Sequence, residues 1–518
     1  MQKGLLEGVK RGETVLEARG ITKRFPGVVA NDHIDFEIKA GEIHAILGEN
    51  GAGKTTLMKV FFGLYQPEEG EIFIGGEKVK FRSPLDAIEL GIGMVHQHRK
   101  LVPAHSVIEN ILLGHPRAGI VLDLKRAEGE VEELCKKYGF KIDFRAKVWQ
   151  ISEGEKQVVE ILKTLYRGAE VLILDEPTSS LTPLETEKLL ESIEAMAQDD
   201  LAIVPFITHK LPIVLAISDR VTVLRRGRVV ACFETEHATE ESLAMEMVGR
   251  EVIFNIERTR VERGKPILQV EDLSARSDKD VIALKGVSFT IHEGEIFGIA
   301  GVSGNGQQEL AEVLAGLRKA EAGNVTLDGN DITHASSLER WQLSMGYIPA
   351  DRIDMGSIGD FSLVENTTMN YYFDGDFVRG GVLDYGKLRN LTKEIISEYD
   401  VATPSADIMA KSLSGGNLQK LILARVLSRK PRLIIAHLPT QGLDIGATEF
   451  VRNKLVEAKV EKAAVLLISE DLDEVLSLSD WVAPIYEGKF MDIIPGEKIR
   501  RESVGAMIAG LHLEREEI

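Results

Sequence analysis

Short apolar runs alternate with helix-patterned segments along both halves of the chain. The runs are Glu42–Gly48, Ala169–Glu176 and Ala202–His209 in the first half, and Glu295–Gly301, Pro431–His437 and Ala464–Glu470 in the second. Each run has the length of a buried strand. Segments such as Thr55–Tyr65 place apolar residues at helical spacing. This alternation predicts an α/β fold, with parallel sheets covered by helices.

The second half of the chain repeats the first. The segment from about Val15 to Gly249 recurs from about Leu268 to Leu511. Between the copies lies a charged stretch that ends in Gly-Lys-Pro, which is typical of a linker. We therefore expect two domains, at residues 14–250 and 267–511, joined by a linker at 251–266.

Composition and charge exclude several classes of protein. A chain of 518 residues is longer than one hydrophobic core supports, and its 44% hydrophobic and 28% charged residues are ordinary for a globular protein. The net charge of −19 argues against a nucleic-acid binder, because phosphate neutralisation needs surplus Lys and Arg. Cys135 and Cys232 are too few for a disulfide framework, so a reduced compartment fits. No apolar window reaches the roughly 20 residues that span a bilayer, so a membrane role requires a partner.

The first copy contains a phosphate-binding loop between a predicted strand and a predicted helix. The sequence GENGAGKTT at Gly48–Thr56 matches the pattern G-x-x-x-x-G-K-[ST]. Its glycines allow backbone N–H groups to cradle anionic phosphates at the start of a helix. Lys54 can reach the β and γ oxygens, and Thr55 offers a hydroxyl to Mg²⁺. The predicted nucleotide-binding residues of this loop are Gly48, Asn50, Gly51, Gly53, Lys54, Thr55 and Thr56.

Two adjacent carboxylates end an apolar strand downstream of this loop. They are Asp175 and Glu176 in the sequence VLILDEPTSS. A charged end to so apolar a strand is costly unless something compensates it, and a Mg²⁺ ion is a natural compensation. We expect Asp175 to support the metal and Glu176 to polarise the attacking water.

Three further segments, in order along the first copy, give it a resemblance to ABC-type ATPases. They are MVHQH with Gln97, ISEGEKQ at Ile151–Gln157, and FITHK with His209. The resemblance implies two tandem P-loop NTPase domains, each with a RecA-like core, an antiparallel β subdomain and a helical subdomain. It implies ATP and Mg²⁺ as cofactors. It also implies that Gln97 and His209 are catalytic residues in addition to Glu176, and that Gln97 senses the metal. It places Phe25 against adenine, although a core or surface role for this ring stays open.

The second copy has lost the corresponding charged and catalytic side chains. Its loop, GVSGNGQQE, carries Gln307 and Gln308 where the first copy has Lys54 and Thr55. At the later positions, Asp175, Glu176, Gln97 and His209 are replaced by His437, Leu438, Ala350 and Glu470. Leucine cannot accept a proton, and imidazole is a poor ligand for Mg²⁺. We expect no hydrolysis and weaker nucleotide binding in this pocket.

The second copy nevertheless keeps a well-formed family signature, LSGGNLQK, with Ser414, Gly415 and Gly416. The first copy has Glu153 where the usual motif has a glycine. In the family, ATP lies between the P-loop of one domain and the signature of the other. The resemblance therefore implies one competent composite site, formed by the first P-loop and the second signature.

A second asymmetry points the same way. The D-loop aspartate of the family is present as Asp444 in the second copy, and Thr182 takes its place in the first. In the family this loop crosses to the opposite site, so Asp444 is expected to support the competent pocket.

The resemblance extends to the tandem ATPases of importers for simple sugars and nucleosides, with the nucleoside branch favoured. It implies polytopic permease subunits as partners, the helical insertion at about Val102–Leu165 as their contact, and an extracytoplasmic substrate-binding protein as an indirect partner. The chain would be peripheral, at the cytoplasmic face of the inner membrane, with no span and no nucleic acid. The alternatives are a soluble tandem ABC ATPase acting on ribosomes or DNA, and a binding module without hydrolysis. The short linker and the degenerate second site argue against the first alternative, and Glu176, Gln97 and His209 argue against the second.

Overall fold

A computed structural model of the chain describes residues 9–96, 100–115, 124–178, 181, 183–199, 201–206, 211–251, 259 and 261–511. The chain divides into two compact units, Met1–Val252 and Ile253–Ile518. The division falls within the stretch for which we expect a linker. No helix in the described ranges is both long and apolar enough to cross a bilayer.

The first unit is built on a six-stranded sheet of order β10-β9-β3-β8-β7-β6. Its strands are β3 (His44–Leu47), β6 (Ile92–Val95), β7 (Val171–Asp175), β8 (Ala202–Phe206), β9 (Arg220–Arg225) and β10 (Arg228–Glu234). From β9 to β6 all neighbours are parallel, and β10 is antiparallel to β9. Because Ile46 and Asp175 both pair with Phe206, the ends of β3 and β7 lie at the same edge of the sheet.

A separate antiparallel sheet of order β2-β1-β4-β5 completes the β structure of this unit. Its strands are β1 (Thr14–Phe25), β2 (Val28–Lys39), β4 (Glu69–Ile74) and β5 (Glu77–Val79). Near it lie α1 (Lys54–Phe61) and α2 (Pro84–Glu89), and α7 (Leu211–Ile217) and α8 (Glu240–Val248) follow later in the chain. A core that includes Phe36, Leu57 and Phe61 joins this sheet to α1 and to the parallel sheet.

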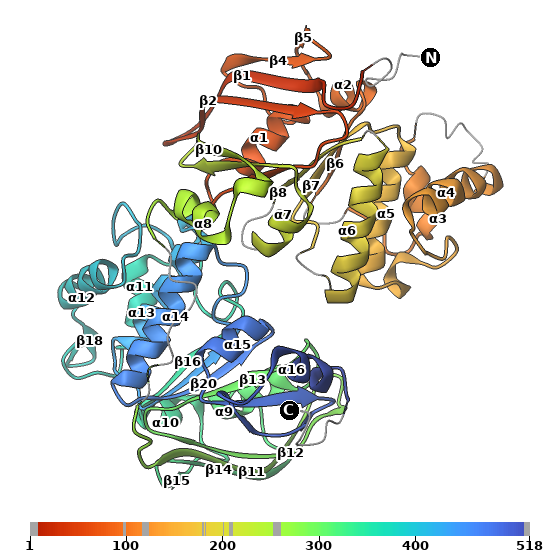
Figure 1. Cartoon of the computed structure of the whole chain (residues 1–518). Helices are drawn as coiled ribbons and strands as arrows, with labels where there is room; N and C mark the ends of the chain where they lie inside the picture. Colours follow the sequence, from red (N-terminus) through yellow and green to blue (C-terminus); the bar gives the residue numbers. More distant parts are fainter. Residues whose placement is uncertain are drawn as a thin grey trace. The chain divides into compact units, whose positions relative to one another are not determined.

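A group of helices lies on the other side of the parallel sheet (Figure 1). It contains α3 (Val107–Leu112), α4 (Leu124–Tyr138), α5 (Glu153–Tyr166) and α6 (Pro183–Gln198), with a 3₁₀ turn at Val148–Gln150. A second core, with Val131, Val159 and Ile193 from α4, α5 and α6, holds these helices together. A further 3₁₀ turn spans Thr235–His237.

The second unit repeats this plan. Its main sheet has the order β16-β19-β20-β13-β21-β22, with β23 beside β21, and its antiparallel sheet has the order β12-β11-β14-β15. The main strands are β13 (Ile296–Ala300), β16 (Met345–Ile348), β19 (Leu433–His437), β20 (Ala464–Ser469), β21 (Trp481–Tyr486), β22 (Lys489–Phe490) and β23 (Ile494–Pro495). The others are β11 (Pro266–Arg276), β12 (Ile282–His292), β14 (Ala322–Leu327), β15 (Asn330–Asp331) and the pair β17 (Val378–Arg379) and β18 (Val382–Leu383).

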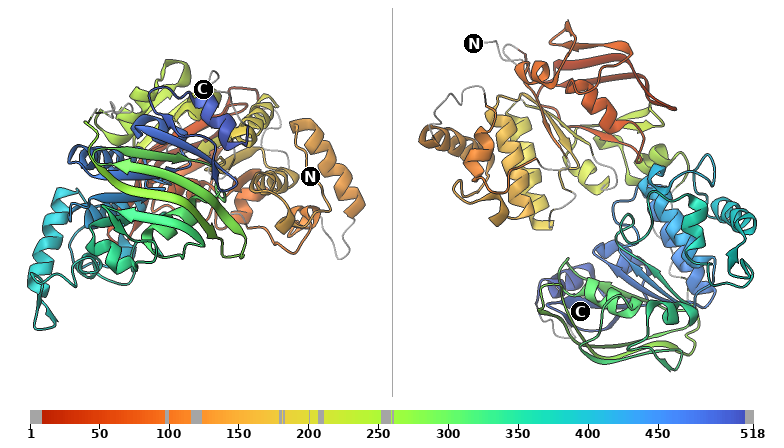
Figure 2. Two further views of the ribbon diagram at one scale, coloured as in Figure 1. Left: turned by 90° about the horizontal axis from the view of Figure 1, so that it is seen from below. Right: turned by 180° about the vertical axis from the view of Figure 1, so that it is seen from behind.

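The helices of the second unit also follow the first. They are α9 (Gln307–Ala315), α10 (Ser337–Gln342), α11 (Leu363–Thr368), α12 (Tyr385–Glu398), α13 (Gly415–Leu427), α14 (Ile445–Val460), α15 (Leu472–Leu478) and α16 (Arg501–Ile508), with a 3₁₀ turn at Ala410–Ser412. The antiparallel sheet (green) and the helical group with α12 (cyan) lie apart, with the parallel sheet between them (Figure 2).

The predicted α/β class is confirmed, and all six predicted apolar runs contain strands. The helix expected at Thr55–Tyr65 is shorter, since α1 ends at Phe61. The chain reverses at Gly63, whose φ of 73° lies in the left-handed region that glycine adopts without strain. A Cβ at this position would lie 2.6 Å from the Ser83 carbonyl oxygen, so only glycine fits this turn.

Candidate active site

The phosphate-binding loop of the first unit connects β3 to α1 at the carboxyl edge of the parallel sheet. Gly53 caps α1 with a φ of 103°, and a Cβ there would lie 2.2 Å from the Ala30 carbonyl oxygen. Gly48 is as constrained, since its Cβ would lie 2.3 Å from the Leu224 carbonyl oxygen. Two of the motif glycines are therefore required by close backbone approach, which leaves the helix N-terminus open toward an anion.

Lys54 is the first residue of α1, and its side chain turns back over the loop. Its Nζ donates to the carbonyl oxygens of Gly48 at 2.6 Å and Glu49 at 2.8 Å. The residue is 5% exposed. The ammonium is largely desolvated and is held against the carbonyl oxygens of the loop. It is well placed to pair with phosphate oxygens, which are stronger acceptors than carbonyls.

The two carboxylates follow β7 at the same edge of the sheet. Asp175 is the last residue of the strand and is buried. Glu176 has a φ of 44°, in the left-handed region that non-glycine residues rarely adopt. Leu438, at the equivalent position of the second unit, has a φ of 49°, so the turn is a repeated feature of the fold. The roles of Asp175 and Glu176 stay predictions.

Three predicted positions, Gln97, Thr182 and His209, lie outside the described residues. The structure does describe the strands that lead to two of them, β6 and β8, which flank β7. Phe25, at the end of β1, is half-buried and packs edge-on against Tyr65 with the ring centroids 5.4 Å apart. Its adenine contact stays a prediction.

The altered signature of the first unit begins α5. Ser152 caps the helix and accepts a hydrogen bond from the Glu155 amide at 3.2 Å. Glu153, the unusual residue, forms an ion pair with Lys156 at 2.5 Å. The altered position of the signature is thus a charged side chain that is paired within its own helix.

In the second unit the loop between β13 and α9 keeps the backbone shape without the ammonium. Gly306 caps α9 with a φ of 102°. The Gln307 amide takes the place of Lys54, since its Nε2 donates to the Val302 carbonyl at 3.0 Å and its Oε1 accepts from the Asn305 amide at 3.1 Å. One of the loop N–H groups is thus already bonded within the loop, which disfavours phosphate binding there.

At the carboxyl edge of the second parallel sheet, a leucine stands at the position of Glu176. Leu438 has a φ of 49°, so it stands in the backbone conformation of Glu176 but cannot accept a proton. Glu470 accepts a hydrogen bond from Ser303 of the P-loop, and partial desolvation raises the pKa of its carboxyl. When ionised, a carboxylate beside the loop repels phosphate. This repulsion weakens phosphate binding further, because the loop already has Gln307 in place of a lysine.

His437 makes a testable contribution to stability. Burial lowers the pKa of His437 to about 4, below the value of about 6.5 in an unfolded chain. The unfolded state therefore binds the proton more readily between these values, so the stabilisation is complete above pH 6.5 and is lost as pH falls toward 4. From pH 7 to pH 5, we expect the free energy of unfolding of the unaltered chain to fall by about 2 kcal/mol more than that of His437→Leu. Thermal unfolding at the two pH values measures this difference. An equal difference between the two proteins at both pH values would contradict this.

The intact signature of the second unit begins α13, next to the D-loop aspartate. Ser414 caps α13 and accepts from the Asn417 amide at 3.4 Å and from its Nδ2 at 2.9 Å. Asp444 caps α14 by accepting from the Ala447 amide at 2.8 Å. A Cβ on Gly416 would lie only 3.2 Å from the Ala447 Cβ. The two helix starts are in close contact, so the signature and the D-loop form one surface.

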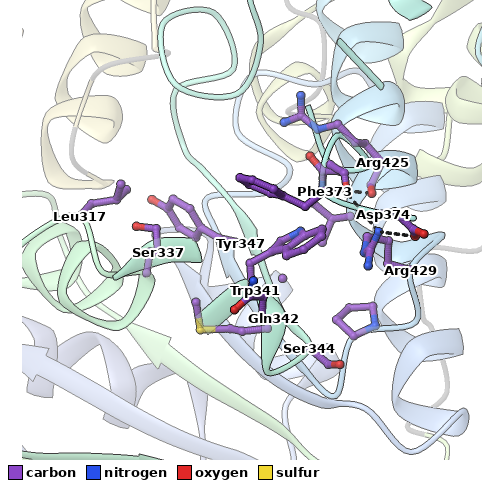
Figure 3. Close-up of a pocket in the computed structure, with 16 residues that line it drawn as sticks. Leu317, Ser337, Trp341, Gln342, Ser344, Tyr347, Phe373, Asp374, Arg425 and Arg429 are labelled. Carbon is purple, nitrogen blue, oxygen red and sulfur yellow. Dashed lines mark hydrogen bonds and ion pairs between the residues drawn. The ribbon is translucent and has the colours of Figure 1, made fainter. Parts of the chain in front are cut away.

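Each unit also has a cavity between its core and its helical group. In the second unit it has a volume of about 480 Å³, and Trp341, Tyr347 and Phe373 project into it beside the Arg429–Asp374 ion pair (Figure 3). The first unit has a smaller cavity, of about 250 Å³, at the same place in the repeat. The lining includes neither phosphate-binding loop, so these cavities are separate from the nucleotide sites.

Sequence reasoning missed two buried residues that support these loops. Asn31, fully buried in β2, donates its Nδ2 to the Gly53 carbonyl at 3.0 Å. Glu474, also fully buried, accepts from Ser469 at 2.6 Å and Thr440 at 2.7 Å, and burial raises the pKa of its carboxyl. Both residues lie among other polar residues in the sequence, so neither its burial nor its partners could be predicted from spacing.

Comparison with known proteins matches this architecture. The family model described as "ABC transporter" matches residues 31–179 and 284–441. The glucose import ATP-binding protein TsgD13 of Haloferax volcanii is 45% identical, with 96% of each chain covered. The guanosine import ATP-binding protein NupO of Bacillus subtilis and the nucleoside import ATP-binding protein NupA of Lactococcus lactis subsp. cremoris are 44% and 42% identical, over 96% of this chain and 98% of each relative.

Among solved structures, the archaeal ribosome recycling factor aABCE1, in complex with the ribosomal stalk protein aP1, resembles the chain with a TM-score of 0.62. The match covers 95% of this chain and 92% of that chain, at 19% identity. At this identity the likeness shows the fold alone.

Proposed function

Because the chain belongs to the ABC transporter family, we propose that it powers the import of a nucleoside or a simple sugar through a partner permease, with a nucleoside as the favoured cargo. The chain is an ATP-binding ATPase subunit. The observation that carries the proposal is the match along nearly the whole chain to relatives named for nucleoside and sugar import. The preference for a nucleoside rests on the sequence resemblance.

We further propose that hydrolysis occurs only on the ATP held by the first P-loop, with the signature at Ser414–Gly416 and Asp444 as its complement. Lys54, Asp175 and Glu176 supply the charge, the metal support and the base that the second unit lacks. Mg²⁺ fits here, since it is held by one or two protein groups together with phosphate oxygens.

For the location we propose a peripheral subunit at the cytoplasmic face of the inner membrane. A permease supplies the membrane path, and the extracytoplasmic substrate-binding protein acts through that permease. The net charge of −19 supports the expectation that the chain does not bind nucleic acid.

Uptake of labelled cargo tests the proposed function. The complete transporter is expressed in cells that lack their own uptake systems for nucleosides and monosaccharides. We expect labelled nucleosides to accumulate with the unaltered chain and not with Lys54→Ala, because import requires the first P-loop. The matched variant Gln307→Ala, at the same position of the second loop, is expected to retain uptake.

The result distinguishes the possible cargoes and the alternative function. Accumulation of labelled glucose or ribose, but of no nucleoside, would assign the sugar cargo. Absence of uptake of either class of cargo with the unaltered chain, together with co-sedimentation of the chain with ribosomes, would favour the soluble alternative.

A further inference from the structure

Arg352 lies in the loop after β16, and its backbone is held by hydrogen bonds within that loop. The Asp351 carboxylate accepts from the amides of Ile353 and Asp354, each at 2.9 Å. The Ser357 hydroxyl donates to the Arg352 carbonyl at 2.8 Å. The loop therefore presents the Arg352 side chain from a defined position.

The guanidinium of Arg352 joins two segments that are distant in sequence. Its Nη1 donates to the carbonyl of Gly415, the first residue of α13, at 3.4 Å. Its Nη2 donates to the carbonyl of Gln441, in the loop that leads to Asp444 and α14. A Cβ on Gly415 or Gly442 would lie 3.4 Å from the same group, so the guanidinium packs closely against both segments.

Electrostatics alone does not account for this placement. The Arg352 guanidinium donates to carbonyl oxygens, as those of Arg340 and Arg425 do in the same unit, and Asp351 is the neighbouring carboxylate. Desolvation lowers the pKa of its guanidinium, and a cation near the N-terminus of a helix opposes the helix dipole. The favourable part of the arrangement is the pair of hydrogen bonds, which depends on the shape of the guanidinium.

A second hydrogen bond, besides those of Arg352, holds the loop between β19 and α14 against α13. Gln419, buried in α13, donates its Nε2 to the Pro439 carbonyl at 2.8 Å. Arg352 adds a link two residues further on, closer to Asp444. The loop between β19 and α14 is thereby held against α13 from its beginning to the D-loop.

We propose that Arg352 is a positioning residue for ATP hydrolysis, which holds the start of the signature helix and the D-loop in fixed register. Ser414 and Asp444 are then presented together to the nucleotide. The proposal rests on the proposed function, in which this signature and Asp444 serve the hydrolysed ATP. Lysine keeps the charge but carries its donors on a single nitrogen, so it cannot place donors at the separate positions of Nη1 and Nη2 as the planar guanidinium does.

Steady-state turnover of the full chain assembled with its permease tests the proposal. For Arg352→Lys and for Arg352→Ala we expect kcat to fall about 10-fold to 100-fold, because a displacement of about 1 Å at a reacting centre costs up to about 100-fold. Binding of fluorescent ADP to the isolated full chain should stay unchanged, because the first P-loop holds it. Thermal unfolding is recorded for every variant.

The control is Arg389→Ala, since Arg389 forms an exposed pair with Asp407 on the same unit. We expect this variant to keep full turnover. Full turnover of Arg352→Lys would show that charge alone suffices and would overturn the proposal, as would full turnover of Arg352→Ala. Parallel loss of ADP binding and thermal stability would indicate a purely structural role and would also overturn it.

Failure of the proposed function is distinguishable from failure of this inference. If the unaltered chain and Glu176→Gln turn over ATP equally, the proposed catalytic site is wrong. If Glu176→Gln is inactive while both Arg352 variants are fully active, only the positioning role is wrong.

Discussion

Replacing Glu176 with glutamine is expected to reduce ATP turnover by the assembled transporter by about 100-fold to 10,000-fold. Glutamine has nearly the same shape and preserves a carbonyl oxygen, but it cannot act as a base toward the attacking water. The measurement is steady-state phosphate release at saturating ATP and Mg²⁺. Binding of ATP should persist, because Lys54 and the loop are unchanged.

The geometry of Glu176 explains why a large effect is expected from one residue. It follows the last residue of β7, and its φ of 44° holds the backbone in a conformation that is costly for a non-glycine residue. The backbone of this turn therefore sets the direction in which the Glu176 side chain leaves the end of β7. The second unit has the same backbone at Leu438 but no carboxylate.

Leu438→Glu is the matched control for Glu176→Gln. It restores a carboxylate on the equivalent turn. The second pocket would still have Gln307 in place of the lysine that pairs with phosphate, and His437 in place of the aspartate that supports the metal. We expect turnover close to that of the unaltered chain. Substantial hydrolysis by Glu176→Gln, or a rise in turnover with Leu438→Glu, would contradict hydrolysis at a single site.

Replacing Lys54 with alanine is expected to weaken ATP binding about 10-fold to 100-fold and to abolish import. A hydrogen bond between charged groups contributes about 1.5–3 kcal/mol, and each 1.4 kcal/mol corresponds to a factor of ten. Nζ of Lys54 bonds to the carbonyls of Gly48 and Glu49, so it is already held over the loop. Equilibrium binding of ATP to the full chain measures the change.

Gln307→Ala provides the control for Lys54→Ala. The two residues occupy the same position of the repeat, and each is 5% exposed and bonded to its own loop. The glutamine variant should therefore disturb packing to a similar extent without removing a charge. A comparable loss of tight ATP binding in both variants would show that the effect comes from loop structure and would contradict the role of the ammonium.

Much of the fold was predictable because the physical constraints are local. The apolar runs at β3, β7 and β8 and their copies at β13, β19 and β20 are too short and too apolar for surface helices. The P-loop was predictable because the spacing of its glycines, Lys54 and Thr55 is a motif in the sequence itself, although the close approaches of Gly48 to Leu224 and of Gly53 to Ala30 are tertiary contacts. The helix that begins at Lys54 was overextended, since the turn at Gly63 depends on a tertiary contact with Ser83.

The remaining features depend on contacts between distant segments. The acceptors of Arg352 lie 63 and 89 residues away, and a single arginine in a loop has no periodic or motif signal. The burial of Glu474 depends likewise on Thr440, which is 34 residues away. The ion pair between Glu153 and Lys156 is local and could have been foreseen from its i,i+3 spacing.

The shared left-handed turn at Glu176 and Leu438 has a consequence for how the two halves diverged. A duplicated enzyme can lose activity by losing its fold or by exchanging side chains on an intact backbone. With φ values of 44° and 49° at these positions, and 103° and 102° at Gly53 and Gly306, the second copy followed the latter course. The second copy therefore keeps the main-chain geometry of both turns and differs from the first in the side chains that those turns carry.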